Sequence, residues 1–453
     1  MESPDKINQF LSKMLMDEAP ELTAELLLQE FRSEDIAEIF DQLEQAEIEG
    51  LYHAFPTGMK GELLIYAGPT LLPVLISILK SSYGEKEIAE ILKDISDDDV
   101  TDILLEFPEE QRNAILTYFS FQDRKEISHL IVYPEDSAGG IMTTEYFAVK
   151  DHLTVREVKQ RLKTTEEIES LLYVYVLDRE DKLEGVCSLH DLLLAFDEET
   201  MSMVMTQDVI FVNCLEDQES VAKIVEKYDL FAIPVTDDQR HLVGIITADD
   251  IMDVIREEHT EDLYKTVGTA EDEIYTKNVM RVARIRLPWL ITTFFGSMLS
   301  AAILSAFNRT LQEIVILTSF VPVITAMGGN IGTQTATIVV RGLAVGYLNI
   351  GKLKATVLRE ISVAAIMGIV VGFIVSVIAV LWHGQPLLGV ILGLSMVSAI
   401  IVASLIGSFA PFIFERLNID PAIAAGPLVT TANDATGIVI YLGLATLMLQ
   451  WLH

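Results

Sequence analysis

Long apolar runs occupy the C-terminal part of the chain and are absent from the rest. Five of them are long enough for a helix to cross a hydrocarbon core of about 30 Å, which takes about 20 residues. They are Leu287 to Phe307, Ile314 to Val340, Ile361 to Trp382, Pro386 to Phe414 and Pro421 to Trp451. The pattern predicts an all-α membrane domain of five transmembrane helices over residues 286–453.

Short amphipathic blocks fill residues 1–130. Leu and Ile recur with acidic residues at helical spacing, as in residues 33–40 and 87–92, glycine is scarce, and several Ser or Thr residues stand where helices would begin. This predicts an acidic helical N-terminal domain of short stacked helices. Residues 264–286 also have a helical pattern without a Gly/Ser-rich linker, so a helix over residues 261–285 is expected to connect the soluble part directly to the first span.

A repeat lies between these parts. Leu183 to Asp191 aligns with Leu242 to Asp250, which places Gly, Ser or Thr, and Asp at three-residue steps in both copies. Upstream, Met142-Thr143 pairs with Met205-Thr206. Each copy has the order strand, helix, two strands, helix. The sequence therefore predicts a duplicated α/β module, with units over residues 131–199 and 200–260.

Charge is segregated along the chain in the same way. The formal net charge is −35, but residues 1–280 carry 62 acidic and 23 basic side chains, whereas residues 281–453 carry 5 and 9. An acidic soluble part repels phosphates, and five apolar runs exclude a soluble domain, so a nucleic-acid-binding protein and a simple cytosolic enzyme are both disfavoured. Met1 to Phe10 lacks the apolar core of a secretory signal, and Cys187 and Cys214 have no paired spacing, so the soluble part is expected in the cytoplasm.

Positive charges set the expected orientation in the membrane. They gather before the first span, between the second and third, and between the fourth and fifth: Arg281, Arg284, Arg286, Arg341, Lys352, Lys354, Arg359 and Arg416. The connections between the first and second spans and between the third and fourth contain only Arg309 as a fixed positive charge. The positive-inside rule then places the N-terminal part in the cytoplasm and the C-terminus outside, across the plasma membrane.

Polar side chains interrupt the second and fifth runs. Asp434 lies in the sequence TTANDATG (430–437), and such a carboxylate inside a bilayer costs several kcal/mol unless it meets water, a partner or a cation. The second run contains MGGNIGTQT (327–335). The two patches predict a polar path through the membrane, lined by Asn330, Gln334, Thr431, Asn433 and Gly437. The alternative is that Asp434 is an interhelical strut and that Asn330 and Gln334 join helices that pack through small residues.

The donor atoms of this path select the ion. Carboxylate, amide and hydroxyl oxygens favour Mg²⁺, Ca²⁺ or Mn²⁺ over softer metals. One carboxylate per chain suits an ion that keeps most of its waters, and Mg²⁺ dehydrates reluctantly. If two chains pair about a twofold axis, both Asp434 side chains would face one central pore.

Acidic clusters in the soluble part are candidate regulatory metal ligands. The densest group, Asp94, Asp97, Asp98, Asp99 and Asp102, lacks the Gly and terminal Glu of an EF-hand. A second group follows the second repeat. The candidates are Asp94, Asp98, Asp249, Asp250, Asp253, Glu257, Glu258, Glu261, Asp262 and, before the fifth run, Asp420. The alternative for any single residue is a solvated surface position. Residues 346–352 are not a phosphate-binding loop, because Leu353 takes the place of the required Ser or Thr after Lys352. The sequence also has no paired-histidine zinc motif, so an enzyme is not predicted.

The repeat resembles the tandem CBS domain. In that family the Gly-x-x-Ser/Thr-x-x-Asp motif of either unit can bind adenosine nucleotides, with the hydroxyl near the phosphates and the Asp on the ribose. The resemblance implies ATP as a ligand of Ser188 with Asp191 and of Thr247 with Asp250. The alternative is that Ser188 and Thr247 are only N-caps of the helices that follow them.

The whole chain resembles the MgtE family of magnesium channels. The resemblance rests on YPEDSAGGIMT (133–143) before two CBS units, RLPWL (286–290), MGGN (327–330) with GTQ (332–334), and DPA (420–422) followed by GP (426–427) and NDATG (433–437). It implies a homodimer in the lipid bilayer, recognition of hydrated Mg²⁺ by Asp434, and closure of the channel when intracellular Mg²⁺ is high.

The charge distribution suggests how closure would work. The acidic cytosolic faces of two chains repel each other without divalent ions, and Mg²⁺ bound between them would favour a compact state. The connecting helix would then act as a plug, and bound ATP would modulate the Mg²⁺ sensitivity by linkage. Two alternatives remain open: a membrane-anchored sensor that conducts no ion, and a coupled carrier that uses Asp434 as a proton site.

Overall fold

The structure, a computed structural model, describes residues 20–164, 171–270, 273, 276, 278–417 and 419–448. Two predicted segments lie outside these ranges: Met1 to Phe10, which was expected to lack a secretory signal, and the last residues of the fifth span. Two compact units are present, residues 1–255 and 256–453. Each is described by itself.

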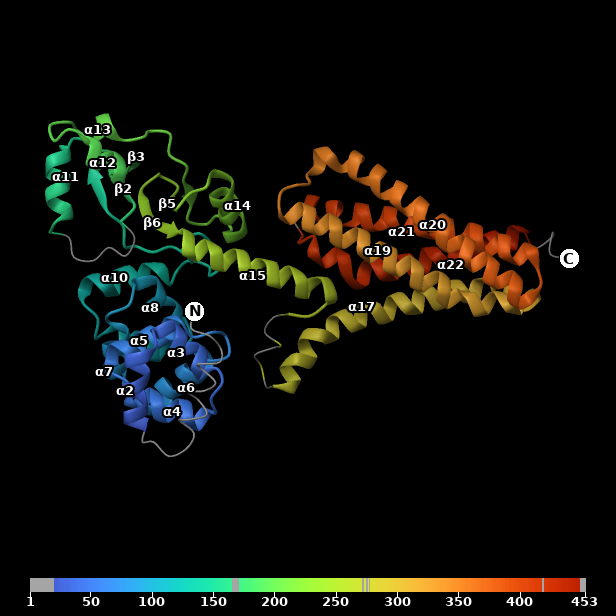
Figure 1. Ribbon diagram of the computed structural model, residues 1–453, viewed down its shortest axis with the longest axis horizontal. Coiled ribbons are helices and arrows are strands. Elements are labelled where there is room, and N and C mark those ends of the chain that lie inside the picture. Colours follow the sequence, from blue (N-terminus) through green and yellow to red (C-terminus); the bar gives the residue numbers. More distant parts are fainter. Residues whose placement is uncertain are drawn as a thin grey trace. The chain divides into compact units, whose positions relative to one another are not determined.

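Short helices build the first part of unit 1 (Figure 1). Most of them pack on the helix two further along the chain, which gives the predicted stack of short helices. Their apolar positions, such as Ile36, Phe40, Leu75 and Ile88, form one continuous core. The helices are α2 (Pro20–Glu30), α3 (Ser33–Phe40), α4 (Gln45–Ala54), α5 (Thr57–Ile65), α6 (Leu72–Ser82), α7 (Glu85–Leu92), α8 (Asp97–Leu105), α9 (Glu109–Leu116) and α10 (Phe121–Leu130).

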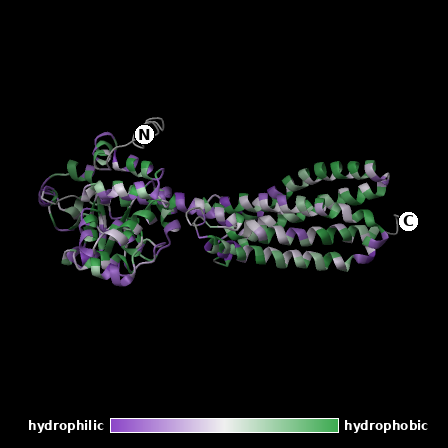
Figure 2. Ribbon diagram, turned by 90° about the horizontal axis from the view of Figure 1, so that it is seen from below, coloured by the Kyte–Doolittle hydropathy of each residue, from purple (hydrophilic) through white to green (hydrophobic). Residues whose placement is uncertain are grey.

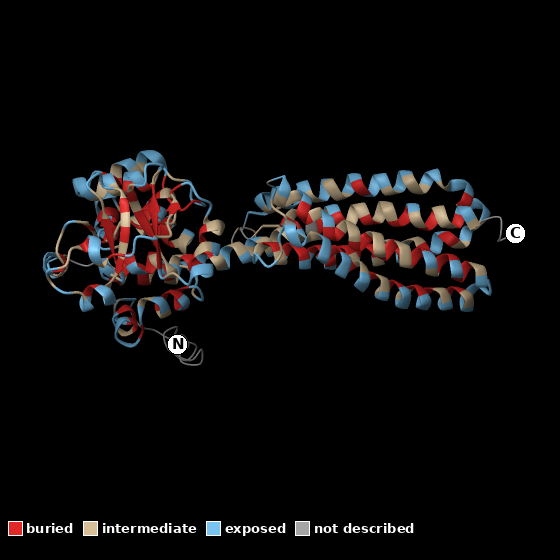
Figure 3. Ribbon diagram, turned by 90° about the horizontal axis from the view of Figure 1, so that it is seen from above, coloured by how far each residue is buried: buried red, intermediate tan, exposed pale blue. Residues whose placement is uncertain are grey.

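The repeat folds as two copies of one small mixed sheet, as predicted. In each, the first strand pairs parallel with the second, and the second pairs antiparallel with the third. The strands are largely buried (Figure 3). The elements are β1 (Ala148–Lys150), α11 (Val155–Leu162), β2 (Tyr173–Leu177), β3 (Leu183–Ser188), α12 (Leu189–Leu194), α13 (Met201–Val204), β4 (Val212–Asn213), α14 (Gln218–Tyr228), β5 (Ala232–Thr236), β6 (Leu242–Thr247) and α15 (Ala248–Val267).

The two copies exchange their N-terminal segments. Thr143, ahead of the first copy, bridges to Ile245 of the second, and Thr206, ahead of the second, bridges to Val186 of the first. Each segment brings a methionine over the glycine of the other copy. A Cβ added at Gly244 would come within 2.6 Å of the sulfur of Met142. The duplication is therefore one interlocked module rather than two separate units.

Unit 2 contains five helical segments that are long and apolar enough to cross a membrane, among the residues described. They are coloured mainly as hydrophobic in Figure 2. The segments are Val279–Ala306, Val315–Ala344, Leu353–His383, Pro386–Arg416 and Gly426–Met448. Their elements are α17 (Val279–Ala306), α18 (Asn308–Glu313), η1 (Val315–Phe320), α19 (Val321–Ala344), η2 (Ile350–Lys352), α20 (Leu353–His383), α21 (Pro386–Arg416), η3 (Ala424–Leu428) and α22 (Val429–Met448). The five predicted spans are confirmed as long apolar helices.

Close helix packing explains the paired glycines of the third and fourth spans. A Cβ at Gly372 of α20 would come within 2.8 Å of the carbonyl oxygen of Gly393 in α21, so only glycine allows the two backbones to approach this closely. The helices also extend past the apolar runs. Because α20 begins at Leu353 rather than Ile361, it includes Glu360, which is buried and paired with Arg359 at 3.1 Å. The hydropathy pattern missed this carboxylate.

The sequence prediction was wrong about the connection into the membrane part. A helix was expected from Tyr264 to Arg286, but α15 ends at Val267 and α17 begins at Val279. Gly268 has a φ of +78°, which lies in the left-handed region, and Thr269 and Ala270 are not helical. A glycine in that conformation commonly ends a helix. Among the described residues, the expected continuous helix is therefore interrupted from Gly268 to Ala270.

The fifth span is also less regular than predicted. Its first part, η3, has a non-helical residue, Gly426, with φ −92° and ψ −130°. Pro427 follows it, and proline both lacks the N–H for an intrahelical bond and disfavours a helical residue before it. The regular helix α22, which contains Asp434, starts only at Val429, after this irregular segment.

Candidate functional site

The helices α19 and α22 bring the predicted membrane patches together. They run antiparallel, because Gly437 packs near Ile324 while Thr430 packs near Gly329. Thr333 and Thr430 lie 3.4 Å apart between their hydroxyls. The second and fifth spans therefore form one interface, and its polar side chains share one level of the helical bundle.

Asn433 fills a groove that glycine creates in α19. Its side chain is 1% exposed, and its amide lies so close to Gly332 that a Cβ there would overlap it. Neither amide atom of Asn433 has a hydrogen-bond partner among the residues that the structure describes. Gly437 is buried on the same interface. These two predicted path residues thus face α19 rather than open space within the single chain.

The other predicted path residues point in different directions. Asn330 and Gln334 are exposed one turn apart on α19. Thr431 packs on Gly296 of α17. Asp434 is half-buried, and no ion pair or hydrogen bond of its side chain is found among the described residues. Amides exposed to lipid and an unpaired carboxylate are costly in a bilayer, so this level of the bundle calls for water, a cation or another protein surface.

Carboxylates converge in the soluble unit from three separate segments. Asp98 and Asp102 lie on α8, Glu135 on the loop after α10, and Asp250 at the start of α15. Packing around the carboxylate, followed by the charges of Asp98, Asp99, Glu135 and Asp250, raises the pKa of Asp102 to about 7. No positive charge is among the causes. We call Asp98, Asp102, Glu135 and Asp250 the carboxylate cluster.

Hydroxyl groups contact two members of the cluster, Asp98 and Asp250. Burial raises the pKa of Asp250 to about 6, although Thr247 donates to its Oδ2 at 2.6 Å and partly offsets the rise. Burial and the charge of Asp99 also raise the pKa of Asp98, and its buried Oδ1 has no hydrogen-bond partner within the described part of the chain. Unneutralised carboxylates in one place favour a divalent cation as counterion.

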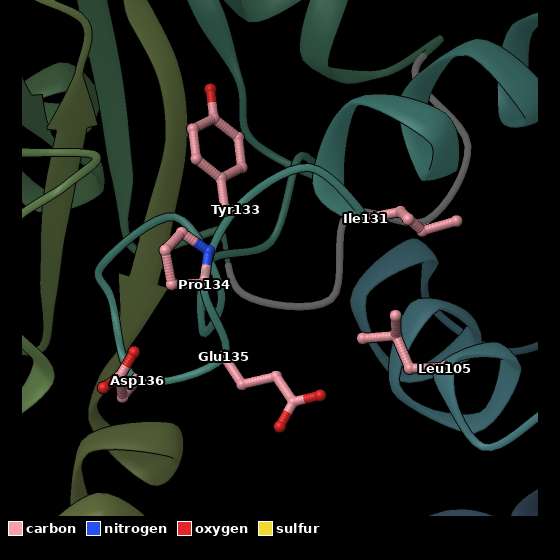
Figure 4. Close-up of a pocket in the computed structure, with 6 residues that line it drawn as sticks. All are labelled: Leu105, Ile131, Tyr133, Pro134, Glu135 and Asp136. Atoms are coloured by element: carbon pink, nitrogen blue, oxygen red, sulfur yellow. The ribbon is translucent and has the colours of Figure 1, made fainter.

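An open hollow borders this cluster (Figure 4). Its volume is about 570 Å³, and it is lined by Leu105, Ile131, Tyr133, Pro134, Glu135 and Asp136. Two of these residues carry carboxylates, and Glu135 is also a member of the cluster. Among the residues described, however, no three Asp, Glu, His or Cys side chains are close enough to hold one ion. The cluster therefore attracts cations electrostatically and does not form a preformed chelating cage.

The remaining acidic candidates lie elsewhere. Asp94 is exposed in the turn before α8, and Asp97 instead meets Glu126, whose hydrogen bond and charge add to burial in raising the Asp97 pKa to about 7. The candidates Asp249, Asp253, Glu257, Glu258, Glu261 and Asp262 all lie on α15. Asp420 lies between α21 and α22 and pairs with Lys265. Sequence patterns gave no sign that Glu135 or Lys265 would join these groups.

The candidate nucleotide residues form two matching hydroxyl–carboxylate pairs. Ser188 accepts a hydrogen bond from the backbone N–H of Asp191 at 3.0 Å and donates to its carboxylate at 2.6 Å. Ser188 is thus the N-cap of α12, which confirms that part of the alternative interpretation. Thr247 precedes α15, and its hydroxyl likewise donates to the Asp250 carboxylate, at 2.6 Å. The Ser188 pair is exposed and the Thr247 pair is partly buried.

Taken together, the fold and the site define a multi-pass membrane protein whose soluble part combines a helical domain with a CBS pair. Family models match three regions: a divalent cation transporter over residues 321–444, the MgtE intracellular N domain over 31–136, and CBS domains over 138–198 and 201–257. The chain is 33% identical to the magnesium transporter MgtE of Bacillus subtilis over 430 residues, which is 93% of this chain and 95% of that protein. The chain belongs to the MgtE family of magnesium transporters.

Further relatives agree. The chain is 38% identical to the magnesium transporter MgtE of Thermus thermophilus over 333 residues, 72% of this chain and 73% of that protein. A crystal structure of the cytosolic domain of the Mg²⁺ channel MgtE in complex with ATP is 32% identical, with a TM-score of 0.47, and covers 51% of this chain and 93% of that one. By its family and by the two MgtE relatives from Bacillus subtilis and Thermus thermophilus, the chain is a transporter with Mg²⁺ as substrate and an intracellular N domain, not an enzyme.

Proposed function

We propose that the protein is a Mg²⁺-selective channel that imports Mg²⁺ across the plasma membrane and closes when intracellular Mg²⁺ binds its cytosolic domain. The observation that carries the proposal is Asp434, half-buried within a transmembrane helix and without a partner among the described residues. It lies at the level of the exposed amides of Asn330 and Gln334. One carboxylate surrounded by amide and hydroxyl oxygens suits a cation that keeps its water shell.

The proposed pore is formed by two chains. The exposed amide face of α19 needs a polar neighbour, and a twofold axis would provide one by placing the same face of a second chain opposite. Two Asp434 side chains would then supply two negative charges to one hydrated ion. With the N domain inside and five spans, the C-terminus lies outside.

Transport through this path is tested in proteoliposomes with an internal Mg²⁺ indicator. Native protein should carry Mg²⁺, and Asp434→Asn should abolish the flux because the neutral amide cannot attract the hydrated cation. Glu313→Gln is the matched control, since it removes an exposed carboxylate of the same membrane unit on α18. Flux that persists in Asp434→Asn at the native rate would refute the pore assignment. No flux from native, folded protein would instead favour the membrane-anchored sensor.

A channel and a coupled carrier differ in their response to protons. A channel should pass Mg²⁺ at the same rate after the pH gradient across the vesicle is collapsed, because the ion moves down its own gradient. A carrier that uses Asp434 as a proton site would lose most of its flux. This comparison uses the same vesicles with an added protonophore.

The carboxylate cluster supports the proposed regulation. It brings α8 of the helical domain next to α15 of the CBS module, and the charges that raise the pKa values of Asp102 and Asp250 are all carboxylates. Mg²⁺ bound there would bring the two domains together, and the ion would shift the population towards the closed state because it binds that state better. The proposed ligands of the regulatory ion are the members of the carboxylate cluster.

ATP is a second proposed ligand of the cytosolic part. The support is the pair of hydroxyl–carboxylate contacts at Ser188 with Asp191 and at Thr247 with Asp250. Because Asp250 is also in the carboxylate cluster, ATP and Mg²⁺ binding would be linked. Calorimetric titration of the full chain with ATP tests this, with Thr247→Val as the variant. Equal ATP binding by native and variant protein would remove Thr247 from the proposed site.

A further inference from the structure

Ion pairs between charged side chains hold the C-terminal end of α15 in place within unit 2. The Lys265 ammonium lies 2.7 Å from Oδ2 of Asp420 and 2.6 Å from Oε1 of Glu261. The other oxygen of Asp420 accepts the backbone N–H of Ala422 at 2.8 Å, which orients the carboxylate. Asp420 belongs to the connection between α21 and α22. One lysine thus neutralises a carboxylate on its own helix and one on the membrane part.

The backbone makes a second contact at the same place. A Cβ added at Gly426 would come within 2.6 Å of the carbonyl oxygen of Thr266, the residue after Lys265. Only glycine leaves room for the end of α15 here. Gly426 is also the non-helical residue of η3, immediately before α22. The end of α15 therefore lies directly against the residues that precede the helix carrying Asp434.

The chain after α15 is tied down as well. Glu273 pairs with Arg286 of α17 at 2.5 Å, and its side chain is only 7% exposed. Gly268 packs on the Trp289 side chain. Glu273 and Gly268 thus contact α17, whereas Lys265 and Thr266 contact the residues between α21 and α22.

We propose that Lys265 is a positioning residue that acts as a tethered cation, holding the end of α15 against η3 and thereby setting the intracellular Mg²⁺ concentration at which transport stops. The ammonium supplies the positive charge that the Glu261–Asp420 carboxylate pair requires, without a bound ion. Removal of the lysine leaves two facing carboxylates that repel each other, so the end of α15 should leave η3 more often. The regulatory part of this inference rests on the proposed function.

Hydrogen exchange on the full chain in lipid nanodiscs tests the contact itself. In EDTA, Lys265→Gln should speed amide exchange about fivefold in residues 261–268 and 426–430, the factor expected for an ion pair worth about 1 kcal/mol. Lys265→Arg should retain the native rate because it preserves the charge. Lys223→Gln is the matched control, since Lys223 has the same four-residue spacing to Glu219 at 2.8 Å but lies on α14. Native exchange in Lys265→Gln would overturn the proposal.

Mg²⁺ flux at varied internal Mg²⁺ tests the regulatory role. Lys265→Gln should raise the half-inhibitory concentration about fivefold, because more Mg²⁺ is needed to hold a loosened contact. Asp420→Asn should act in the same direction, since the amide oxygen can still accept the Ala422 N–H but no longer pairs with lysine. An unchanged or lowered half-inhibitory Mg²⁺ concentration in Lys265→Gln would overturn the regulatory role of Lys265. A lowered concentration would in addition mean that the lysine competes with Mg²⁺. Native protein without Mg²⁺ flux would refute the proposed transport, whereas the hydrogen-exchange rates would still test the contact between α15 and η3.

Discussion

Neutralising Asp250 should strengthen the contact between α8 and α15 when no divalent ion is present. Its pKa is raised to about 6 by burial and by the charges of Asp249 and Asp98, despite hydrogen bonds from Thr247. The usual value of 3.8 applies in the unfolded chain. The folded form therefore binds the proton more tightly, and its stability falls as pH rises from about 4 to about 6 and stays low above that.

The size of the effect follows from this shift. Two pKa units correspond to about 3 kcal/mol, which is an upper limit because Asp250 keeps some solvent contact. Asp250→Asn removes this cost at pH 7.5 and keeps an oxygen that accepts from the Thr247 hydroxyl. Amide exchange in α8 and in the first turn of α15 should slow by up to about 100-fold in EDTA, since about 1.4 kcal/mol is a factor of ten.

Hydrogen exchange of the full chain at pH 7.5 measures this, with and without Mg²⁺. Added Mg²⁺ should slow exchange strongly in the native protein and only weakly in Asp250→Asn, which has already lost the repulsion and one ligand. Asp191→Asn is the matched control, because it is the equivalent residue of the first copy and its side chain is 58% exposed. Unchanged or faster exchange in Asp250→Asn in EDTA would refute the reasoning.

Other consequences can be measured in parallel. Gly332→Ala should destabilise the membrane unit by about 1–3 kcal/mol because its methyl group overlaps Asn433, whereas Gly328→Ala, whose nearest atoms are 3.9 Å away, should have a much smaller effect on thermal unfolding in detergent. Ser188→Ala should weaken α12 by about 1 kcal/mol through loss of its N-cap, visible as faster exchange there; native exchange would show that the cap adds nothing. Protection of α8 by Mg²⁺ should be larger at pH 8 than at pH 6, because the ion must displace the proton that Asp102 binds with a pKa of about 7; equal protection would remove Asp102 from the cation site.

The buried amide of Asn433 has different surroundings from the carboxylate of its neighbour Asp434. The sequence placed Asn433 and Asp434 together in one polar motif. On the helix they point in different directions, because successive residues differ by about 100°. Asn433 fills the Gly332 groove, and Asp434 is left without a partner among the described residues. Adjacent motif residues therefore have different surroundings.

Features that depend on local pattern could be predicted from the order of residues alone. Apolar runs of sufficient length must form helices in a bilayer, because every backbone polar group has to be satisfied within the segment. The repeated strand and helix patterns likewise determined the duplicated module, down to the Ser188 cap. The fold class and the family resemblance follow from these features alone.

Which charged side chains meet became visible only in the folded chain. Asp102, Glu135 and Asp250 come from distant segments, and so do Lys265 and Asp420. A charged residue leaves no periodic pattern that names its partner, whereas an apolar face must be buried by something. The tertiary structure also decided where the connecting helix stops, because the left-handed Gly268 sits against Trp289 and a helical pattern in the sequence does not reveal that contact.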